Sequence, residues 1–348
     1  MAAAILVEEG HEVVGVTMKT FCYSDVPEHG KTCCGLDGIS DAKRVAAHLD
    51  IPHYVFDVEE DFNRDVIDDF VSEYAQGRTP NPCVRCNSNT KFRDLLQRGQ
   101  ALRCDRIASG HYVRIAHGPE GAALLRGRDP NKDQSYFLWG LPREMLPKLL
   151  FPLGELTKDE VRTRARELTL ATAEKPESQE ICFVPTGDYR DLLRKRLGTV
   201  HPALQPGSLV SSTGEVLGEH PGYAGFTVGQ RKGLPGGFPD PMFVLAVRAD
   251  TREVVIGGRE ELFSDTVEVH ELNWLTRVPV LGAEVGVQLR YRAAAVPATV
   301  VSTEGVLRMD LREEFAAVTP GQSAVVFDGD RVLGGGRIVG AGRRSPAQ

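Results

Sequence analysis

The chain has 348 residues, of which 41% are hydrophobic and 26% charged, and its formal net charge is −7. This length predicts two or three domains, and this composition is typical of a globular protein rather than a disordered or fibrous one. The longest apolar run, residues 2–7, is too short to cross a bilayer and has no basic lead-in of the kind found in secretory signals. We therefore expect a cytoplasmic protein without membrane contact, whose seven cysteines are thiols, metal ligands or catalytic groups rather than a disulfide framework.

Charge is distributed unevenly along the chain. Residues 78–132 contain eleven lysines and arginines but only four acidic residues, whereas residues 51–77 contain eight acidic residues and one arginine. A basic stretch on an acidic protein can serve as a binding surface for phosphate groups of nucleic acid. On charge alone, a solvated surface with chance clustering explains the pattern equally well.

Helices and strands alternate in the first third of the chain. Helical spacing and capping residues predict helices at residues 2–9, 40–50, 61–74 and 87–102. Short β-branched runs predict strands at residues 12–18, 53–58 and 105–109. This order predicts an α/β fold in which a parallel sheet is covered by helices and binds ligands at the carboxyl ends of its strands. The strand, glycine-rich phosphate loop and helix that usually open such a nucleotide-binding domain are not recognisable in the sequence.

The composition and periodicity of the sequence change after Arg190. Residues 197–237 are rich in glycine and proline, and helical spacing is scarce from there to the end. Alternating runs predict strands at residues 243–256, 266–272, 284–291, 298–302, 307–311 and 322–327. Short strands separated by turns are typical of a small antiparallel barrel or sandwich.

The strongest local motif is a C-x-x-C pair formed by Cys83 and Cys86, just before a predicted basic helix. A helix N-terminus and the neighbouring Arg85 both favour the thiolate, which is the reactive form of cysteine. A redox or sulfur-transferring pair, half of a metal site and two structural cysteines all remain open. A zinc ribbon would need a second C-x-x-C at suitable spacing, which adjacent Cys33 and Cys34 do not provide.

Cys182 lies in a polar tract, residues 177–183, that is typical of an active-site loop, although a half-buried cysteine beside Phe183 is an equally good interpretation. Cys104 precedes a predicted strand and is expected to be a core residue. Two further patches suit ligand contacts: the mixed polar and aromatic segment 127–138, and Gly110-His111-Tyr112 after a predicted strand. Each of these patches is also compatible with an ordinary polar loop or turn.

The motifs TPNPCVRCN, ASGHYVR, KDQSYFL, SQEICFV, FTVGQRKGL, RYR and TPGQ follow one another along nearly the whole chain. In this order they resemble the tRNA-specific 2-thiouridylases. The resemblance implies a PP-loop ATP-pyrophosphatase domain at residues 1–195, a small central domain at 196–262, a C-terminal antiparallel β-barrel at 263–342 and a tail at 343–348. It further implies ATP-dependent replacement of the C2 oxygen of the tRNA wobble uridine by sulfur.

The resemblance also assigns roles to residues. It makes Cys86 the nucleophile and Cys182 the carrier of a persulfide, and the two would pair in a disulfide after transfer. The remaining positions that match the family are three for the target base (Asn81, Pro82 and Cys83), two for ATP (Met18 and Gly110) and seven for tRNA (His111, Lys132, Asp133, Gln134, Arg290, Tyr291 and Gln322). ATP with Mg²⁺ is the expected cosubstrate, the anticodon arm of tRNA the expected partner, and a cysteine desulfurase or sulfur-relay protein the expected donor.

The sequence departs from the family pattern at two points. Many members have Asp at the position of Cys83, so Cys83, Cys86 and Cys182 form a three-thiolate set resembling that of related enzymes that bind a 4Fe–4S cluster. Residues 1–7 correspond to the helix after the family's SGGVDSS-type loop, so the first strand and this loop are expected to lie outside the sequence. The alternatives are therefore a catalytically impaired tRNA-binding remnant, a cluster-dependent thiolation, and another PP-loop adenylating enzyme such as an amidotransferase.

Overall fold

The computed structural model describes residues 1–20, 36–175, 181–184, 187–234 and 236–344. The chain divides into two compact units, which we call the first and the second unit. The first unit comprises Met1–Ile67, Pro82–Tyr189 and Asp330–Val332, and the second comprises Asp68–Asn81, Arg190–Gly329 and Leu333–Gln348. Among the described residues, no helix combines the length and apolar character needed to cross a bilayer.

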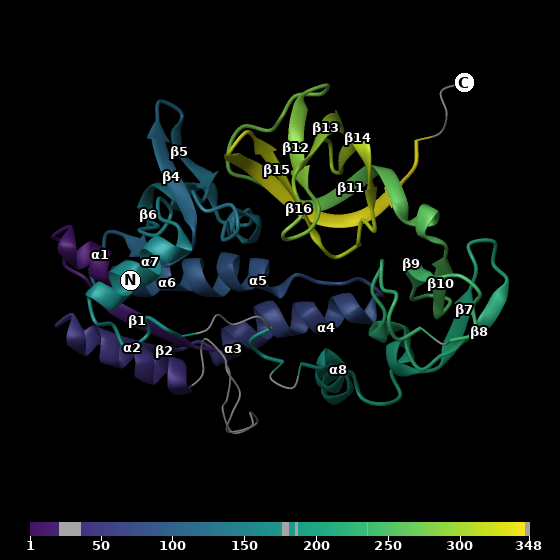
Figure 1. The fold of residues 1–348 in the computed structure, drawn as a ribbon, viewed down its shortest axis with the longest axis horizontal. Coiled ribbons are helices and arrows are strands. Elements are labelled where there is room, and N and C mark those ends of the chain that lie inside the picture. The colour runs from purple at the N-terminus through teal and green to yellow at the C-terminus, as the bar shows by residue number, and fades with distance from the viewer. Residues whose placement is uncertain (21–35, 176–180, 185–186, 235, 345–348) are drawn as a thin grey trace. The chain divides into compact units, whose positions relative to one another are not determined.

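The first unit contains the alternating α/β part of the chain (Figure 1). Strand β1 pairs in parallel with β2, from Gly15 opposite His53 to Lys19 opposite Asp57, and β3 pairs in parallel with β6. The prediction of a parallel sheet is thereby confirmed, although the described strands form two separate pairs. Its helices and strands are α1 (Ala2–Glu8), β1 (Gly15–Lys19), α2 (Leu36–His48), β2 (His53–Asp57), α3 (Glu59–Phe62), η2 (Asn63–Ile67), α5 (Pro82–Arg85), η3 (Cys86–Asp94), α6 (Leu95–Ala101), β3 (Ile107–Ala108), β4 (Val113–Gly118), β5 (Gly121–Arg126), η4 (Ser135–Phe137), η5 (Arg143–Lys148), β6 (Leu149–Leu150) and α7 (Lys158–Glu167).

The hairpin β4–β5 and helix α7 are among the elements of the first unit that were not predicted. The antiparallel hairpin β4–β5 follows the predicted turn at Gly110–Tyr112. Helix α7 begins with a capping box, in which the Thr157 side chain accepts from the Glu160 backbone and the Glu160 side chain accepts from the Thr157 backbone. This reciprocal pair satisfies two backbone donors that a helix start otherwise leaves unpaired.

The second unit contains a four-stranded sheet in the order β8-β7-β10-β9 and a six-stranded barrel in the order β11-β14-β13-β12-β15-β16, which β11 and β16 close by pairing with each other. The predicted C-terminal antiparallel barrel is thus confirmed (Figure 1). The elements of this unit are α4 (Asp68–Ala75), α8 (Tyr189–Leu197), η6 (Pro202–Leu204), β7 (Gly207–Val210), β8 (Val216–His220), η7 (Tyr223–Gly225), β9 (Phe243–Arg248), β10 (Glu253–Gly257), η8 (Arg259–Leu262), β11 (Phe263–Trp274), β12 (Glu284–Gln288), β13 (Val296–Ser302), β14 (Leu307–Ala316), β15 (Ser323–Asp328) and β16 (Arg331–Gly342).

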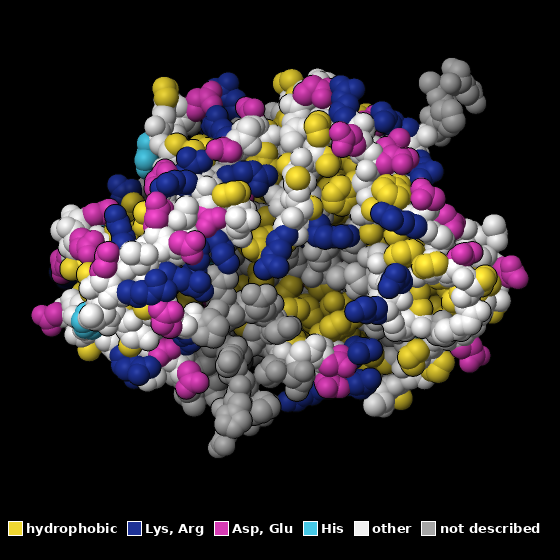
Figure 2. All heavy atoms as spheres, viewed as in Figure 1, with side chains coloured by type: hydrophobic (Ala, Val, Ile, Leu, Met, Phe, Trp, Pro, Cys, Tyr) yellow, Lys and Arg dark blue, Asp and Glu magenta, His cyan; other side chains and the backbone are white. Residues whose placement is uncertain are grey.

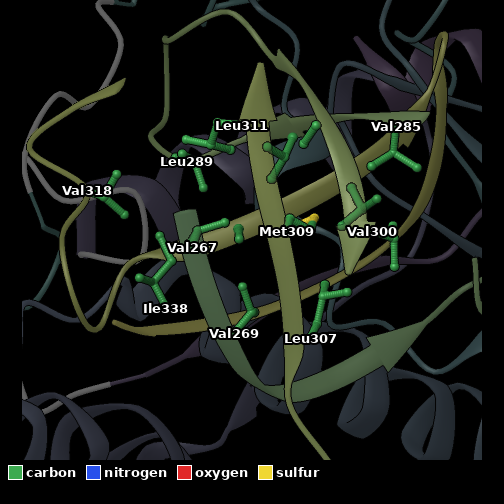
Figure 3. Close-up of a cluster of buried hydrophobic side chains, with 14 residues drawn as sticks. Val267, Val269, Val285, Leu289, Val300, Leu307, Met309, Leu311, Val318 and Ile338 are labelled. Carbon is green, nitrogen blue, oxygen red and sulfur yellow. The ribbon is translucent and has the colours of Figure 1, made fainter. Parts of the chain in front are cut away.

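Alternate residues along the barrel strands form its core. Val267 and Val269 of β11, and Leu307, Met309 and Leu311 of β14, are all fully buried. Figure 3 shows their side chains pointing into the barrel together with those of neighbouring strands. The period of two that predicted these strands is therefore the pattern that fills the core, because successive side chains of a strand point to opposite faces.

Strand β16 closes the barrel, and the sequence analysis did not predict it because it contains Gly334, Gly335 and Gly336. Glycine normally weakens a strand. Here a Cβ on Gly334 would lie 2.3 Å from the backbone oxygen of Asn273 in β11. Glycine is required because the two closing strands approach each other too closely for a side chain.

Candidate active site

The two cysteines of the C-x-x-C motif lie in one continuous helical segment, residues 82–101, formed by α5, η3 and α6. The helix begins at Pro82, a residue favoured at the first helical position because its missing N–H would be unpaired there anyway. Cys83 is exposed in the first turn, whereas Cys86 is buried with 9% exposure and begins η3. The prediction that the helix begins after Cys86 was wrong, and it is Cys83 that lies in the first turn, where the macrodipole acts most strongly.

The segment η3 that starts at Cys86 is a π-helix of nine residues, and η2 is a second π-helix of five residues packed against it. π-Helical segments cost hydrogen-bond geometry and occur most often at functional sites. Phe92 of η3 is 1% exposed and anchors the segment in the core. The π-helix thus begins at Cys86, the residue predicted to be the nucleophile.

The K-D-Q-S-Y-F-L motif and the residues just after it contact this helix. The Asn87 side-chain amide donates to the Phe137 carbonyl at 3.3 Å. Gly140 lies so close to Ser88 that a Cβ there would be 2.3 Å from the Ser88 Oγ. Phe137 of the motif and the nearby Gly140 therefore contact the C-x-x-C helix closely.

Asn87 is a polar residue that the sequence analysis did not single out. It is 3% exposed, and its Oδ1 has no hydrogen-bond partner among the described residues. Leaving such an acceptor unpaired costs on the order of 1–3 kcal/mol, so a buried unpaired amide oxygen indicates a site for a ligand donor or water. The sequence feature that could have indicated Asn87 is its position directly after the C-x-x-C motif.

His111 lies between aromatic rings of the same unit. Its ring centroid is 5.7 Å from that of Phe92 and 6.3 Å from that of Phe151, and its Nδ1 is 2.7 Å from the Ser109 Oγ. Burial, together with the positive charge of Lys91, lowers the pKa of His111 to about 3. The imidazole is therefore neutral at physiological pH, so any contact it makes with RNA is a neutral hydrogen bond or a stacking contact.

Asp133 and Gln134 connect the two patches that the sequence predicts to contact ligands, residues 127–138 and 110–112. The Asp133 carboxylate accepts from Arg126 at 2.8 Å, from the Gly127 backbone at 3.0 Å and from Ser135 at 2.8 Å. Gln134 accepts from the Tyr112 backbone through its Oε1 at 3.0 Å. Both side chains thus hold the loop in place, while Lys132 of the same motif is half-buried.

Cys182 is a half-buried thiol in a described segment of four residues, 181–184. The ring of its neighbour Phe183 meets that of Phe62 in α3 edge to face, with the centroids 5.7 Å apart. Helix α3 in turn packs against η3, which begins at Cys86. The fold therefore links the Cys182 segment to the C-x-x-C helix through one intervening helix. Most of the tract that carries the motif, residues 176–180, lies outside the described residues.

The described cysteines do not form a metal site. No group of three or more histidines, cysteines or acidic residues is placed to hold a metal ion within the part of the chain that the structure describes. Cys83, Cys86, Cys104 and Cys182 are not joined in disulfides. The three thiolates considered for a 4Fe–4S cluster are thus not gathered as ligands, and neither is a Cys86–Cys182 disulfide formed.

A cavity of about 380 Å³ lies beside the carboxyl end of β3. Ser109 and Gly110 line it from that end, whereas Gly15, Val16 and His53 line it from the amino ends of β1 and β2. Exposed Gly110 presents backbone without a side chain, as a nucleotide site requires. Met18, the other residue predicted to contact ATP, is half-buried on β1 opposite Phe56.

Four predicted site residues belong to the second unit: Asn81, Arg290, Tyr291 and Gln322. Arg290 is exposed and donates to the Ala317 carbonyl at 2.8 Å, and half-buried Tyr291 lies under the Arg292 guanidinium at 5.6 Å. Figure 2 shows lysine and arginine side chains recurring over the visible face, interspersed with fewer acidic ones, rather than one continuous basic patch.

Comparison with known proteins gives the same domain order. Residues 1–186 match the tRNA methyl transferase HUP domain family, residues 194–258 the tRNA methyl transferase PRC-barrel domain family, and residues 264–338 the aminomethyltransferase beta-barrel domain family. A tRNA-specific 2-thiouridylase MnmA of Geobacter metallireducens is 47% identical over 344 residues, covering 97% of this chain and 93% of the relative. The chain belongs to the tRNA-specific 2-thiouridylase family.

Other 2-thiouridylases match over similar lengths. The MnmA proteins of Geotalea uraniireducens and Rhodospirillum centenum are 47% and 45% identical, and the matches cover 97% and 100% of this chain and 91% and 90% of those relatives. The match therefore spans both units, and membership of the 2-thiouridylase family applies to the whole chain.

Proposed function

We propose that the chain is a tRNA-uridine 2-sulfurtransferase that uses ATP to thiolate the wobble uridine, with Cys86 as nucleophile and Cys182 as persulfide carrier. The observation that carries this proposal is the buried thiol of Cys86 at the start of a π-helix, in a chain that matches 2-thiouridylases over nearly its full length. The packing of Phe183 on α3, which itself packs on η3, supports a meeting of the two thiols.

The chemistry requires both activation and sulfur delivery. The uridine C2 oxygen is a poor leaving group, and its transfer to the α-phosphate of ATP, with release of pyrophosphate, makes it leave as AMP. The terminal sulfur of a Cys182 persulfide attacks C2 and displaces AMP. The Cys86 thiolate then attacks the Cys182 sulfur, so that the persulfide S–S bond breaks and its electron pair stays on the sulfur now bound to the base. The resulting Cys86–Cys182 disulfide is reduced by two electrons from an external thiol.

The remaining roles follow the same proposal. Asn81, Pro82 and Cys83 contact a uridine that has left the anticodon stack, as base-modifying enzymes generally require. Gly110 and the neighbouring cavity accept part of ATP, whose Mg²⁺ would balance the phosphate charge. Lys132 and Arg290 contact tRNA phosphates, and the neutral His111 contacts RNA without a charge. The sulfur comes from a cysteine desulfurase or a relay protein.

The test compares Cys86→Ser and Cys182→Ser with the matched control Cys104→Ser, since Cys104 is another cysteine of the first unit that is in no disulfide. Each protein is incubated with tRNA, ATP, Mg²⁺, cysteine and a cysteine desulfurase, and the tRNA nucleosides are analysed by mass spectrometry. We expect the first two variants to lose 2-thiouridine formation while their affinity for tRNA is unchanged, and the control to keep both. Turnover in either variant removes that cysteine from the mechanism, and tRNA binding without thiolation by the unaltered chain contradicts the proposed activity.

A further inference from the structure

The turn Thr319-Pro320-Gly321-Gln322 of the second unit grips the segment that precedes the C-x-x-C helix. The Gln322 Nε2 donates to the carbonyl oxygens of Thr79 and Pro80, at 2.8 Å and 3.2 Å. The Thr79 N–H donates to the Pro320 carbonyl at 2.9 Å. Three hydrogen bonds thus join these two stretches, which are about 240 residues apart along the chain. We call this set of contacts the clamp.

The geometry of the clamp depends on a glycine. Gly321 has a φ of +92°, and a Cβ there would lie 2.8 Å from the backbone N, C and O atoms of Thr79. Both the backbone conformation and the close approach therefore exclude a side chain at this position. The turn is itself anchored to β16, because the Gly321 N–H donates to the Ile338 carbonyl and the Ile338 N–H to the Gln322 carbonyl, each at 2.8 Å.

The other end of the gripped segment is also fixed within the second unit. The Tyr223 hydroxyl donates to the Ala75 carbonyl at 2.7 Å. The Arg337 guanidinium lies 2.6 Å from Glu73 and 2.8 Å from Asp69, and Arg78 donates to Glu73 at 2.8 Å. Residues 68–80 are thus held from α4 to the clamp.

We propose that Gln322 and Gly321 are positioning residues, which fix the backbone at Thr79–Pro80 and thereby set the path of Asn81-Pro82-Cys83 into the nucleophile helix. Only Asn81 separates the gripped carbonyls from Pro82, whose ring fixes its own φ and restricts Asn81 to extended conformations. A change at the clamp is therefore passed along a stiff stretch of chain to Cys83 and Cys86. The catalytic consequence rests on the proposed function, whereas the positioning itself does not.

The role of the Gln322 amide in the clamp differs from a direct contact with tRNA. If the amide served only to bind RNA, its replacement would weaken tRNA binding and leave the RNA-free protein unchanged. If the amide positions Thr79–Pro80, its replacement loosens the helix start even without RNA. These two effects can be measured separately.

The decisive experiment measures alkylation of Cys86 in the RNA-free protein by iodoacetamide, followed by mass spectrometry of the peptide. Buried thiols react with alkylating reagents through local opening of the structure. Gln322→Glu keeps the size of the side chain but removes the donor, so two hydrogen bonds are lost. This loss should raise the rate of Cys86 alkylation about tenfold. Gly321→Ala should do the same. The alkylation rate of Cys104 in each sample serves as the internal reference. Gln205→Ala is the matched control, because the Gln205 side chain also donates to a backbone carbonyl of the second unit, that of Thr199. An unchanged Cys86 rate in both clamp variants overturns the proposal.

A second measurement concerns catalysis. In Gln322→Glu we expect kcat for thiolation to fall about tenfold while the Kd for tRNA stays within about twofold of the unaltered protein. A raised Kd with unchanged kcat would make Gln322 an RNA contact and not a positioning residue. If the unaltered chain does not thiolate tRNA at all, the proposed function fails, but the alkylation result still decides whether the clamp positions the helix.

Discussion

Removal of the buried carboxylate of Glu73 should destabilise the second unit more than the loss of any surface ion pair. The Glu73 side chain is 4% exposed and lies between Arg78 and Arg337, whose side chains are 30% and 10% exposed. Removing one partner of a buried ion pair typically costs about 3–5 kcal/mol, because the other charge is left in the interior without compensation. In Glu73→Ala, Arg78 can turn to water and Arg337 keeps Asp69 at 2.8 Å, so neither charge is stranded completely. We therefore expect a loss of about 2–3 kcal/mol, at or below the low end of that range.

The assay is urea denaturation of the unaltered protein, Glu73→Ala and Arg337→Met, with hydrogen exchange of the α4 amides as a local readout. The double variant completes a mutant cycle, and contacting charges should show a coupling of about 1–3 kcal/mol. A loss below about 0.5 kcal/mol for Glu73→Ala would match an exposed pair instead and would refute the view that the network holds α4.

Acid should weaken the same network. Burial alone would raise the pKa of Glu73, but the hydrogen bond from Arg78 and the charge of Arg337 bring it below its ordinary value of 4.5. The folded protein thus releases this proton more readily than the unfolded chain does. The stabilisation is complete above pH 4.5 and is lost as the pH falls through the lowered value in the folded state. Glu73→Gln should lack this component, so the stability difference between variant and unaltered protein should shrink below pH 4.5.

Three further outcomes test the first unit. The pKa of His111 is about 3 in the folded protein and 6.5 ordinarily, so the unfolded chain gains a proton first as the pH falls. The melting temperature should therefore fall more steeply with acidification from pH 6.5 in the unaltered protein than in His111→Gln. Equal slopes would contradict the burial of a neutral imidazole. Gly140→Ala should cost about 1–3 kcal/mol in urea denaturation because its Cβ meets the Ser88 Oγ, and Ser88→Ala in the same chain should recover most of that loss; no recovery would place the strain elsewhere. Lys132→Ala should weaken tRNA binding and reduce the slope of log K against log salt by about 1, whereas exposed Lys148 serves as a control; an unchanged slope would show that Lys132 touches no phosphate.

The local sequence pattern was sufficient to predict several features of the molecule. Apolar and β-branched patterns predicted the strands that became β1 and β2 and the barrel strands β11 to β15, because the inward-facing residues of a half-buried strand must be apolar wherever the strand lies. The T-x-x-E pattern at Thr157 was available as a capping signal for α7 and was not used. The order of motifs along the chain was sufficient to recognise the family resemblance, which the comparisons confirmed.

Other features depend on residues that meet only in the fold. The glycine run of β16 predicts a loop from the sequence alone. In the fold it is a strand, because β11 lies against it at a distance that only glycine permits. The start of the C-x-x-C helix at Pro82, its π-helical turn and the neutral state of His111 follow from packing and burial, which no short stretch of sequence specifies. Gln322 illustrates the reason most directly, because its amide binds carbonyls about 240 residues away, and such pairings are chosen by the tertiary arrangement of the chain and not by neighbouring residues.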